Sequence, residues 1–168
     1  MSKIWIAALI VTMSCAKQES APLAATDSLP SAPVSSSAED KAALASYTLD
    51  MEKINKLSAF MANAASYRKS HPGEDLEVSL DATDDLDTSI QKIESNTAAK
   101  QLLTESGLTA REYVLLVSAY LGAGMTVTML DTNPNAKIPD NVNPKNVEFI
   151  RTHKAELDQM KKAMEENE

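Results

Sequence analysis

The chain has 168 residues, a formal net charge of −8 and a single cysteine, Cys15. Its acidic balance disfavours binding to nucleic acid and to anionic lipid, because like charges repel. A lone cysteine permits neither an intramolecular disulfide nor a metal site built from several cysteines. The length predicts one domain with enough chain to form a hydrophobic core.

The first residues have the composition of an export signal. Lys3 gives a positive start, and residues 4–13 form an apolar run that is too short to span a hydrocarbon layer about 30 Å thick. Ser14 places a small residue directly before Cys15. We therefore expect residues 1–14 to be a signal peptide and the remainder to be exported.

This pattern resembles the precursor of a bacterial lipoprotein, which is cleaved directly before a lipidated cysteine. The resemblance implies that Cys15 becomes the first mature residue and carries acyl chains, and two or more such chains give lasting attachment to membrane lipid. Ala16 resembles the class that is sorted to the outer membrane. The segment Ser14-Cys15-Ala16 also fits an ordinary secretory cleavage site, which would leave a soluble protein that begins at Lys17.

Residues 15–37 are predicted to be the lipidated cysteine followed by a flexible linker. Ser, Ala and Pro dominate this segment, it has no apolar period, and its three prolines discourage a helix. A coil of this length has a mean reach of about 25 Å. Residues 38–168 then form a single helical domain, and the linker tethers that domain to the membrane.

Residues 38–69 are expected to form one long helix. Ser36 and Glu39 fit a capping box at its start. Apolar residues then recur at steps of three and four along a single stripe, and residues 70–73 end the helix. The stripe consists of Leu44, Tyr47, Met51, Ile54, Leu57 or Ser58, Met61 and Ala65.

Two short helices are predicted after an acidic, mostly exposed loop over residues 74–87. The first begins near Asp84, where acidic residues favour the start of a helix. The second is capped by Asn96 or Thr97 and ends at Gly107.

Residues 113–130 contain no charged side chain over 18 positions. A capping box formed by Thr109 and Glu112 marks the start of this helix. Its length is that of a short transmembrane span, but Gly, Ser and Thr residues dilute its hydropathy. A helix that is apolar on all sides is also what the centre of a bundle requires, and we favour that interpretation.

The last predicted helix follows a proline-containing loop over residues 131–143, with Asn143 as its cap and Pro144 at its first position. Its apolar face carries Val147, Ile150, His153, Leu157, Met160 and Met164. No segment shows a convincing alternation of apolar and polar residues. The sequence therefore predicts an all-α fold, a compact bundle of about four to five helices after a disordered tether.

Methionine and histidine provide the sharpest candidate for a ligand site. Met125 with Met129, and Met160 with Met164, are pairs at i and i+4, and His153 lies near the second pair. Thioether and imidazole ligands suit Cu(I). Methionine at helical spacing is ordinarily core filler, so we assign no metal and no cofactor and keep this set as an alternative.

No motif of a hydrolase or metalloprotease is present, and no thiol nucleophile follows Cys15, so we expect no enzymatic activity. By elimination, the sequence favours a lipoprotein anchored to the outer membrane and facing the periplasm, whose helical domain binds a periplasmic or outer-membrane protein. The alternative is a soluble periplasmic protein that binds a copper-like metal or a small ligand.

Overall fold

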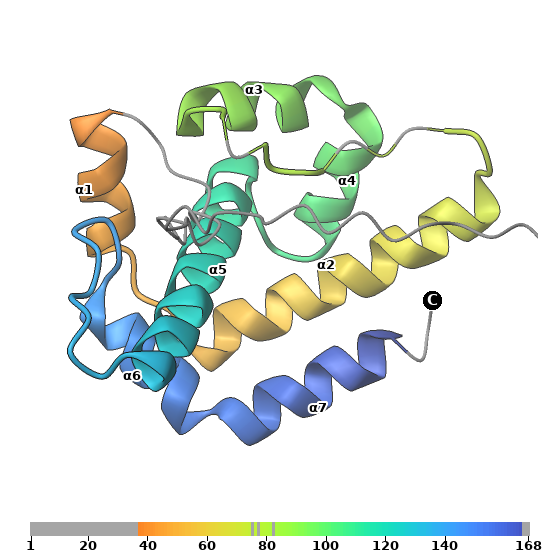
Figure 1. The fold of residues 1–168 in the computed structure, drawn as a ribbon. Helices are drawn as coiled ribbons and strands as arrows, with labels where there is room; N and C mark the ends of the chain where they lie inside the picture. The colour runs from red at the N-terminus through yellow and green to blue at the C-terminus, as the bar shows by residue number, and fades with distance from the viewer. Residues whose placement is uncertain (1–36, 75, 77, 82, 166–168) are drawn as a thin grey trace, which may run out of the picture.

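The computed structural model describes residues 37–165 except 75, 77 and 82, and within these residues it contains seven helices and no strand (Figure 1). The all-α prediction is confirmed, but the helices number seven rather than about four to five. Cys15, the predicted signal and nearly all of the predicted linker lie outside the described residues. The helices are α1 (Ala38–Ser46), α2 (Met51–Ser70), α3 (Leu86–Ser95), α4 (Thr97–Glu105), α5 (Ala110–Thr132), α6 (Pro144–Thr152) and α7 (Lys154–Glu165).

The single long helix predicted over residues 38–69 is wrong, because the chain leaves the helical conformation after Ser46. Ser37, not Ser36, caps α1 by accepting a hydrogen bond from the backbone of Asp40. The carboxylate of Asp50 accepts a hydrogen bond of 2.8 Å from the amide of Lys53 and so starts a second helix. An N-cap of this kind competes with continuation of the preceding helix.

The break also changes which face of α2 is buried. Ile54, Phe60 and Ala64 are buried, whereas Met61, a member of the predicted stripe, is 37% exposed. The ring of Phe60 packs edge-on against Tyr113 of α5, with 4.9 Å between the ring centres. Since α1 and α2 are separate helices, the stripe of one does not set the rotation of the other.

Helix α5 is the centre of the molecule and packs against α1, α2, α3, α4 and α6 (Figure 1). Its first half lies in the main core, where Val114 and Leu116 are fully buried. Among the described residues it is the one helix long and apolar enough to cross a membrane, and 44% of its most apolar window is buried. The interpretation as a core helix therefore fits its first half better than its second.

The loop between α2 and α3 was expected to be mostly exposed, but it buries two apolar side chains. Leu76 and Val78 are both buried and belong to the main core. The hydroxyl of Tyr113 donates a hydrogen bond of 3.0 Å to the carbonyl of Val78. This bond ties the loop to the start of α5.

The last predicted helix is also two helices, because the chain turns at His153. The predicted start is confirmed, with Asn143 as the cap and Pro144 in the first turn. Helix α6 packs on α5 around a small second core of Ala123, Val142 and Val147. Helix α7 packs on α2 instead and contributes Leu157 to the main core. A straight helix cannot follow both surfaces, and the turn at His153 lets each half bury its own face.

Candidate functional site

The side of α5 around Leu121 is one of the places where a large apolar side chain is exposed in the described part of the chain. We call it the α5 face and define it as Val117, Leu121, Gly124, Met125 and Thr128. Leu121 is 42% exposed, and Val117 and Met125 are half-buried. These three residues follow one another at steps of four, so they form one stripe along the helix.

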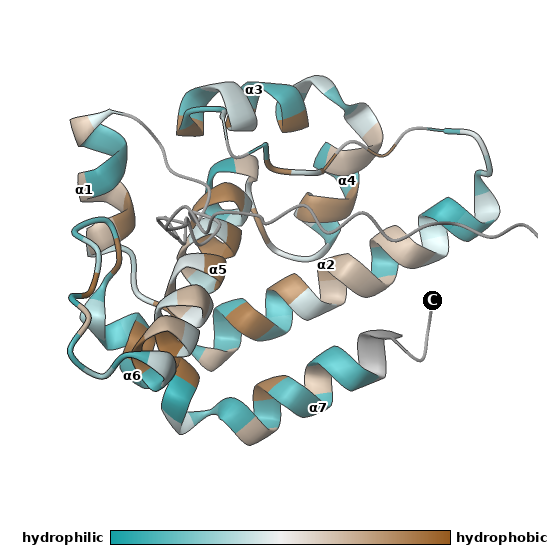
Figure 2. Ribbon diagram, viewed as in Figure 1, coloured by the Kyte–Doolittle hydropathy of each residue, from teal (hydrophilic) through white to brown (hydrophobic). Residues whose placement is uncertain are grey.

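The α5 face is uncovered because the neighbours of α5 change along its length. Helices α3 and α4 pack on α5, whose first half buries Tyr113 and Val114. In the second half, the buried residues Gly122 and Ala123 point the other way, toward Val142. Figure 2 shows mainly apolar to neutral colours along this half of α5. Leu121 is thus the one exposed large apolar side chain of α5, and it lies in a stripe that carries no charge.

Two asparagines at the start of α6 hold the linker between α1 and α2. The side-chain amide of Asn146 donates a hydrogen bond of 2.9 Å to the carbonyl of Tyr47 and accepts one of 2.9 Å from the amide of Leu49. Asn143 donates a second hydrogen bond of 3.1 Å to the same carbonyl of Tyr47. We call these contacts the asparagine clamp. They satisfy backbone groups that would otherwise be buried without partners.

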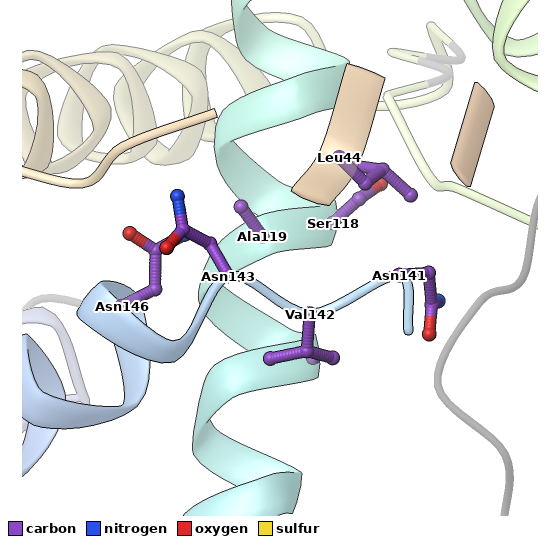
Figure 3. A pocket seen from close by; sticks show the side chains of 8 residues that line it. Leu44, Ser118, Ala119, Asn141, Val142, Asn143 and Asn146 are labelled. Carbon is purple, nitrogen blue, oxygen red and sulfur yellow. The ribbon is translucent and has the colours of Figure 1, made fainter. Parts of the chain in front are cut away.

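A small cavity of about 10 Å³, with a mixed polar and apolar lining, lies beside the clamp and beneath Leu44 of α1 (Figure 3). This volume is about that of one water molecule. The side chain of Ser118 lines the cavity and is only 8% exposed, and its hydroxyl has no hydrogen-bond partner in the described part of the chain. The cavity is too small for a substrate, but it places an unpaired polar group directly under α1.

A larger crevice of about 470 Å³ lies between the end of α2 and the start of α4. Its walls include Tyr67, Glu74 and Gln101, and Leu102 contributes apolar surface. The hydroxyl of Tyr67 donates a hydrogen bond of 2.5 Å to Glu74, and this bond raises the pKa of Tyr67. The ring of His71 stacks on Tyr67, with 4.1 Å between ring centres.

A second crevice of about 370 Å³ lies where α3, α4 and α5 meet. The buried residues Leu103 and Leu108 form its apolar floor, and charged side chains, Glu94, Lys100 and Glu112, surround it. The carboxylate of Glu112 is already used in the capping box with Thr109, whose hydrogen bonds lower the pKa of this glutamate. Glu112 is therefore a structural carboxylate rather than a free acid or base.

The methionine and histidine set is spread over different surroundings. Met125 and Met129 are half-buried on α5, whereas Met160 packs against the main core from α7. His153 ends α6, where its ring stacks on Phe149 and one ring nitrogen lies 3.1 Å from the carbonyl of that residue. The side chain of the fifth member, Met164, is outside the described residues. A copper site from this set stays a prediction without added support.

Within the described residues, no three side chains of His, Cys, Asp or Glu are grouped closely enough to hold a metal ion. Carboxylates in the acidic loop and at the start of α3 are instead used locally. Asp81 accepts hydrogen bonds from the backbone and the hydroxyl of Thr83, and Asp85 caps α3. These bonds lower the pKa of both carboxyl groups.

Sequence reasoning missed the asparagine clamp and both crevices. The clamp had a partial signal, since Asn143 before Pro144 predicts a cap, but nothing local indicates that Asn146 reaches a linker 97 residues earlier in the chain. The uncharged run in α5 was visible in the sequence, and only the packing shows which side stays open.

No protein-family model, curated protein or solved structure matches this chain. Its function must therefore be inferred from these surfaces.

Proposed function

We propose that this protein is a non-enzymatic lipoprotein of the bacterial envelope whose helical domain binds a protein partner through the α5 face. The observation that carries the proposal is the 42% exposure of Leu121 within a helix segment that has no charged side chain from 113 to 130. Exposing such a stripe to water is unfavourable, by about 25 cal/mol for each Å² of apolar surface. A partner that covers it removes this cost.

The N-terminal sequence supports the membrane half of the proposal. Cys15 follows a short apolar run, and residues 16–37 have the composition of a flexible spacer. A spacer with a mean reach of about 25 Å holds the domain within roughly its own diameter of the bilayer. Anchorage to the outer membrane on its periplasmic side would limit the search for a partner to the envelope.

The lipid anchor is tested by the mass and the location of the protein made in its own cells. We expect the purified protein to have the mass of the chain from Cys15 plus acyl groups, and to sediment with membranes. Cys15→Ala should move it to the soluble fraction. A bare chain that begins at Lys17, with no effect of the substitution on location, would contradict the anchor and indicate a soluble periplasmic protein.

The protein partner is tested by placing a photo-crosslinking amino acid at single positions in the living cell. We expect a discrete adduct from position Leu121 and none from Gln91, which is also exposed but lies on α3. Leu121→Asp should abolish capture of the same adducted protein by the purified chain, because it places a charge in the apolar contact. Equal adducts from both positions, or none from Leu121, would contradict this part of the proposal.

The crevice between α2 and α4 favours a second candidate function, a periplasmic binder of a small ligand. Its volume of about 470 Å³ lies within the range of small-molecule sites. Glu74 and Tyr67 offer a carboxylate and a ring at its wall. Native mass spectrometry of the protein from its own envelope should then show a stoichiometric addition that Glu74→Gln removes. A clean mass in wild type would dismiss this candidate, and a copper-sized addition retained by Glu74→Gln would favour the metal alternative.

A further inference from the structure

We propose that α1 is a strap that opens while α2 to α7 remain folded, and that its opening widens the α5 face. The strap is a property of the fold, whereas the meaning of the wider face rests on the proposed function. Three independent observations support it: the small buried surface of α1, the position of the asparagine clamp and the cavity beneath the helix.

Helix α1 is attached to the core by very little surface. In its nine residues, Leu44 is the one side chain that is buried, and all others are exposed or half-buried. A helix of this length is marginal in water without tertiary contacts. Most of the stability of α1 must therefore come from Leu44 and from the attachment of its C-terminal end.

The asparagine clamp sets the point about which α1 can move. Its hydrogen bonds end on Tyr47 and Leu49, directly after α1, and Lys53 adds a bond of 2.9 Å to the carbonyl of Thr48. The linker is thus fixed to α6 and α2. Residues before Tyr47 receive no such bonds from another helix in the described structure. Opening can stop at the clamp without unfolding α2.

The surface under α1 makes its opening less costly than that of a helix on a dry core. Lifting Leu44 exposes its apolar side chain, but the cavity of about 10 Å³ beneath it means that Leu44 makes fewer contacts than a leucine in a closely packed core. Fewer contacts are therefore lost on opening, and the polar side chain of Ser118 is exposed together with the leucine. The closed and open states are therefore closer in free energy than the burial of Leu44 alone suggests.

The residues uncovered by opening adjoin the α5 face. Ser118 lies three residues before Leu121, which already belongs to the face, so the two residues are neighbours on the surface of α5. Small side chains here would let a partner approach the backbone of α5 closely. The strap thus occupies one edge of the proposed docking surface and directly follows the predicted tether in the sequence.

Hydrogen exchange on the full chain tests the strap by itself. We expect the amides of residues 41–47 to exchange faster than those of α2 and α5, and Leu44→Ala to speed them by at least about tenfold while α5 stays unchanged. Leu49→Ala is the matched control, because Leu49 is equally buried but lies within the clamp, and it should speed exchange throughout the domain. If Leu44→Ala speeds amide exchange in α2 and α5 as much as in α1, the proposal of a strap is wrong.

The link to the partner is tested by photo-crosslinking from position Leu121 in the Leu44→Ala background. We expect a higher adduct yield than with Leu44 present, because a larger fraction of the molecules is open. An unchanged yield together with fast exchange in α1 overturns the widening of the face and leaves the proposed function standing. Absence of an adduct in both backgrounds overturns the proposed function and the role of the wider face, while the exchange data alone decide the strap.

Discussion

The side chain of Asn146 is 1% exposed and uses both ends of its amide on the linker between α1 and α2. Replacing it with alanine leaves the buried amide of Leu49 without a partner. We expect Asn146→Ala to lower the free energy of unfolding by about 1–3 kcal/mol in urea titrations followed by circular dichroism. Asn141→Ala is the control, because Asn141 lies in the loop directly before α6 and takes no part in the clamp. An equal loss of unfolding free energy in both variants would mean that the hydrogen bonds of the clamp do not stabilise the fold.

Tyr113 gives the protein a predictable response to alkaline pH. Burial raises the pKa of this phenol from 10.0 to about 12. Between these two values the unfolded chain binds fewer protons than the folded one, so the free energy of unfolding falls as the pH rises. The stabilising contribution is fully present below pH 10 and is lost toward pH 12.

The matching variant is Tyr113→Phe, which removes both the titration and the hydrogen bond to Val78. We expect it to be less stable than wild type by about 1 kcal/mol near neutral pH. The difference should shrink between about pH 10 and about pH 11.5, because only the wild type loses the contribution of this phenol. A difference that stays constant over this range would show that Tyr113 ionises normally in the folded state.

Burial of single residues was only partly predictable from the sequence. Leu44, Ile54 and Leu157 were placed on apolar faces and are buried, but Phe60 was overlooked in favour of Met61. The two are neighbours on α2, and a rotation of one residue decides between them. That rotation is set by the edge-on contact of Phe60 with Tyr113, a contact between residues far apart in the chain.

At the scale of elements, two glycines in different surroundings give opposite predictions. Gly107 follows α4 with a φ of +71°, a conformation that other residues adopt only with strain. Gly124 lies inside α5, where an added Cβ would meet nothing within 4 Å. We expect Gly107→Ala to lower the free energy of unfolding by about 1 kcal/mol and Gly124→Ala to raise it by about 0.5–1 kcal/mol. Thermal unfolding of both variants checks this prediction. A melting temperature that shifts in the same direction in both variants would contradict it.

The starts of helices were predicted better than their continuity. Asn96, Thr109 and Asn143 are caps in the structure as expected, because a cap is a bond between residues two or three apart. The breaks after Ser46 and at His153 were missed, because each depends on a surface elsewhere in the fold. The linker between α1 and α2 is held by α6, and α7 turns away to reach α2.

At the scale of the whole molecule, the sequence predicted the all-α class but not the candidate site. The uncharged run in α5 predicts a helix that is buried on all of its sides. The structure instead buries different sides of its two halves, toward α3 and α4 first and toward α6 afterwards. The open stripe around Leu121 follows from this change of neighbours, which no local pattern contains.

The two cores are joined closely enough to predict a single cooperative unfolding unit for α2 to α7. Ile150 contacts both cores, and α5 runs through both. A substitution in the small core should therefore also destabilise distant helices. We expect Val147→Ala to cost about 1–3 kcal/mol and Leu103→Ala, in the main core, about 2–5 kcal/mol.

The measurement is a urea titration followed residue by residue by NMR, with the amides of Gln91 in α3 and Glu148 in α6 as reporters. Each variant should lower the midpoint of both reporters equally, because the loss of either core unfolds the other. Amides of α1 should lose protection before this transition, since α1 opens at the clamp. A shift of the Glu148 midpoint alone in Val147→Ala would divide the molecule into two units, with α6 independent of α3. The α5 face would then lie at a movable junction rather than on a rigid helix.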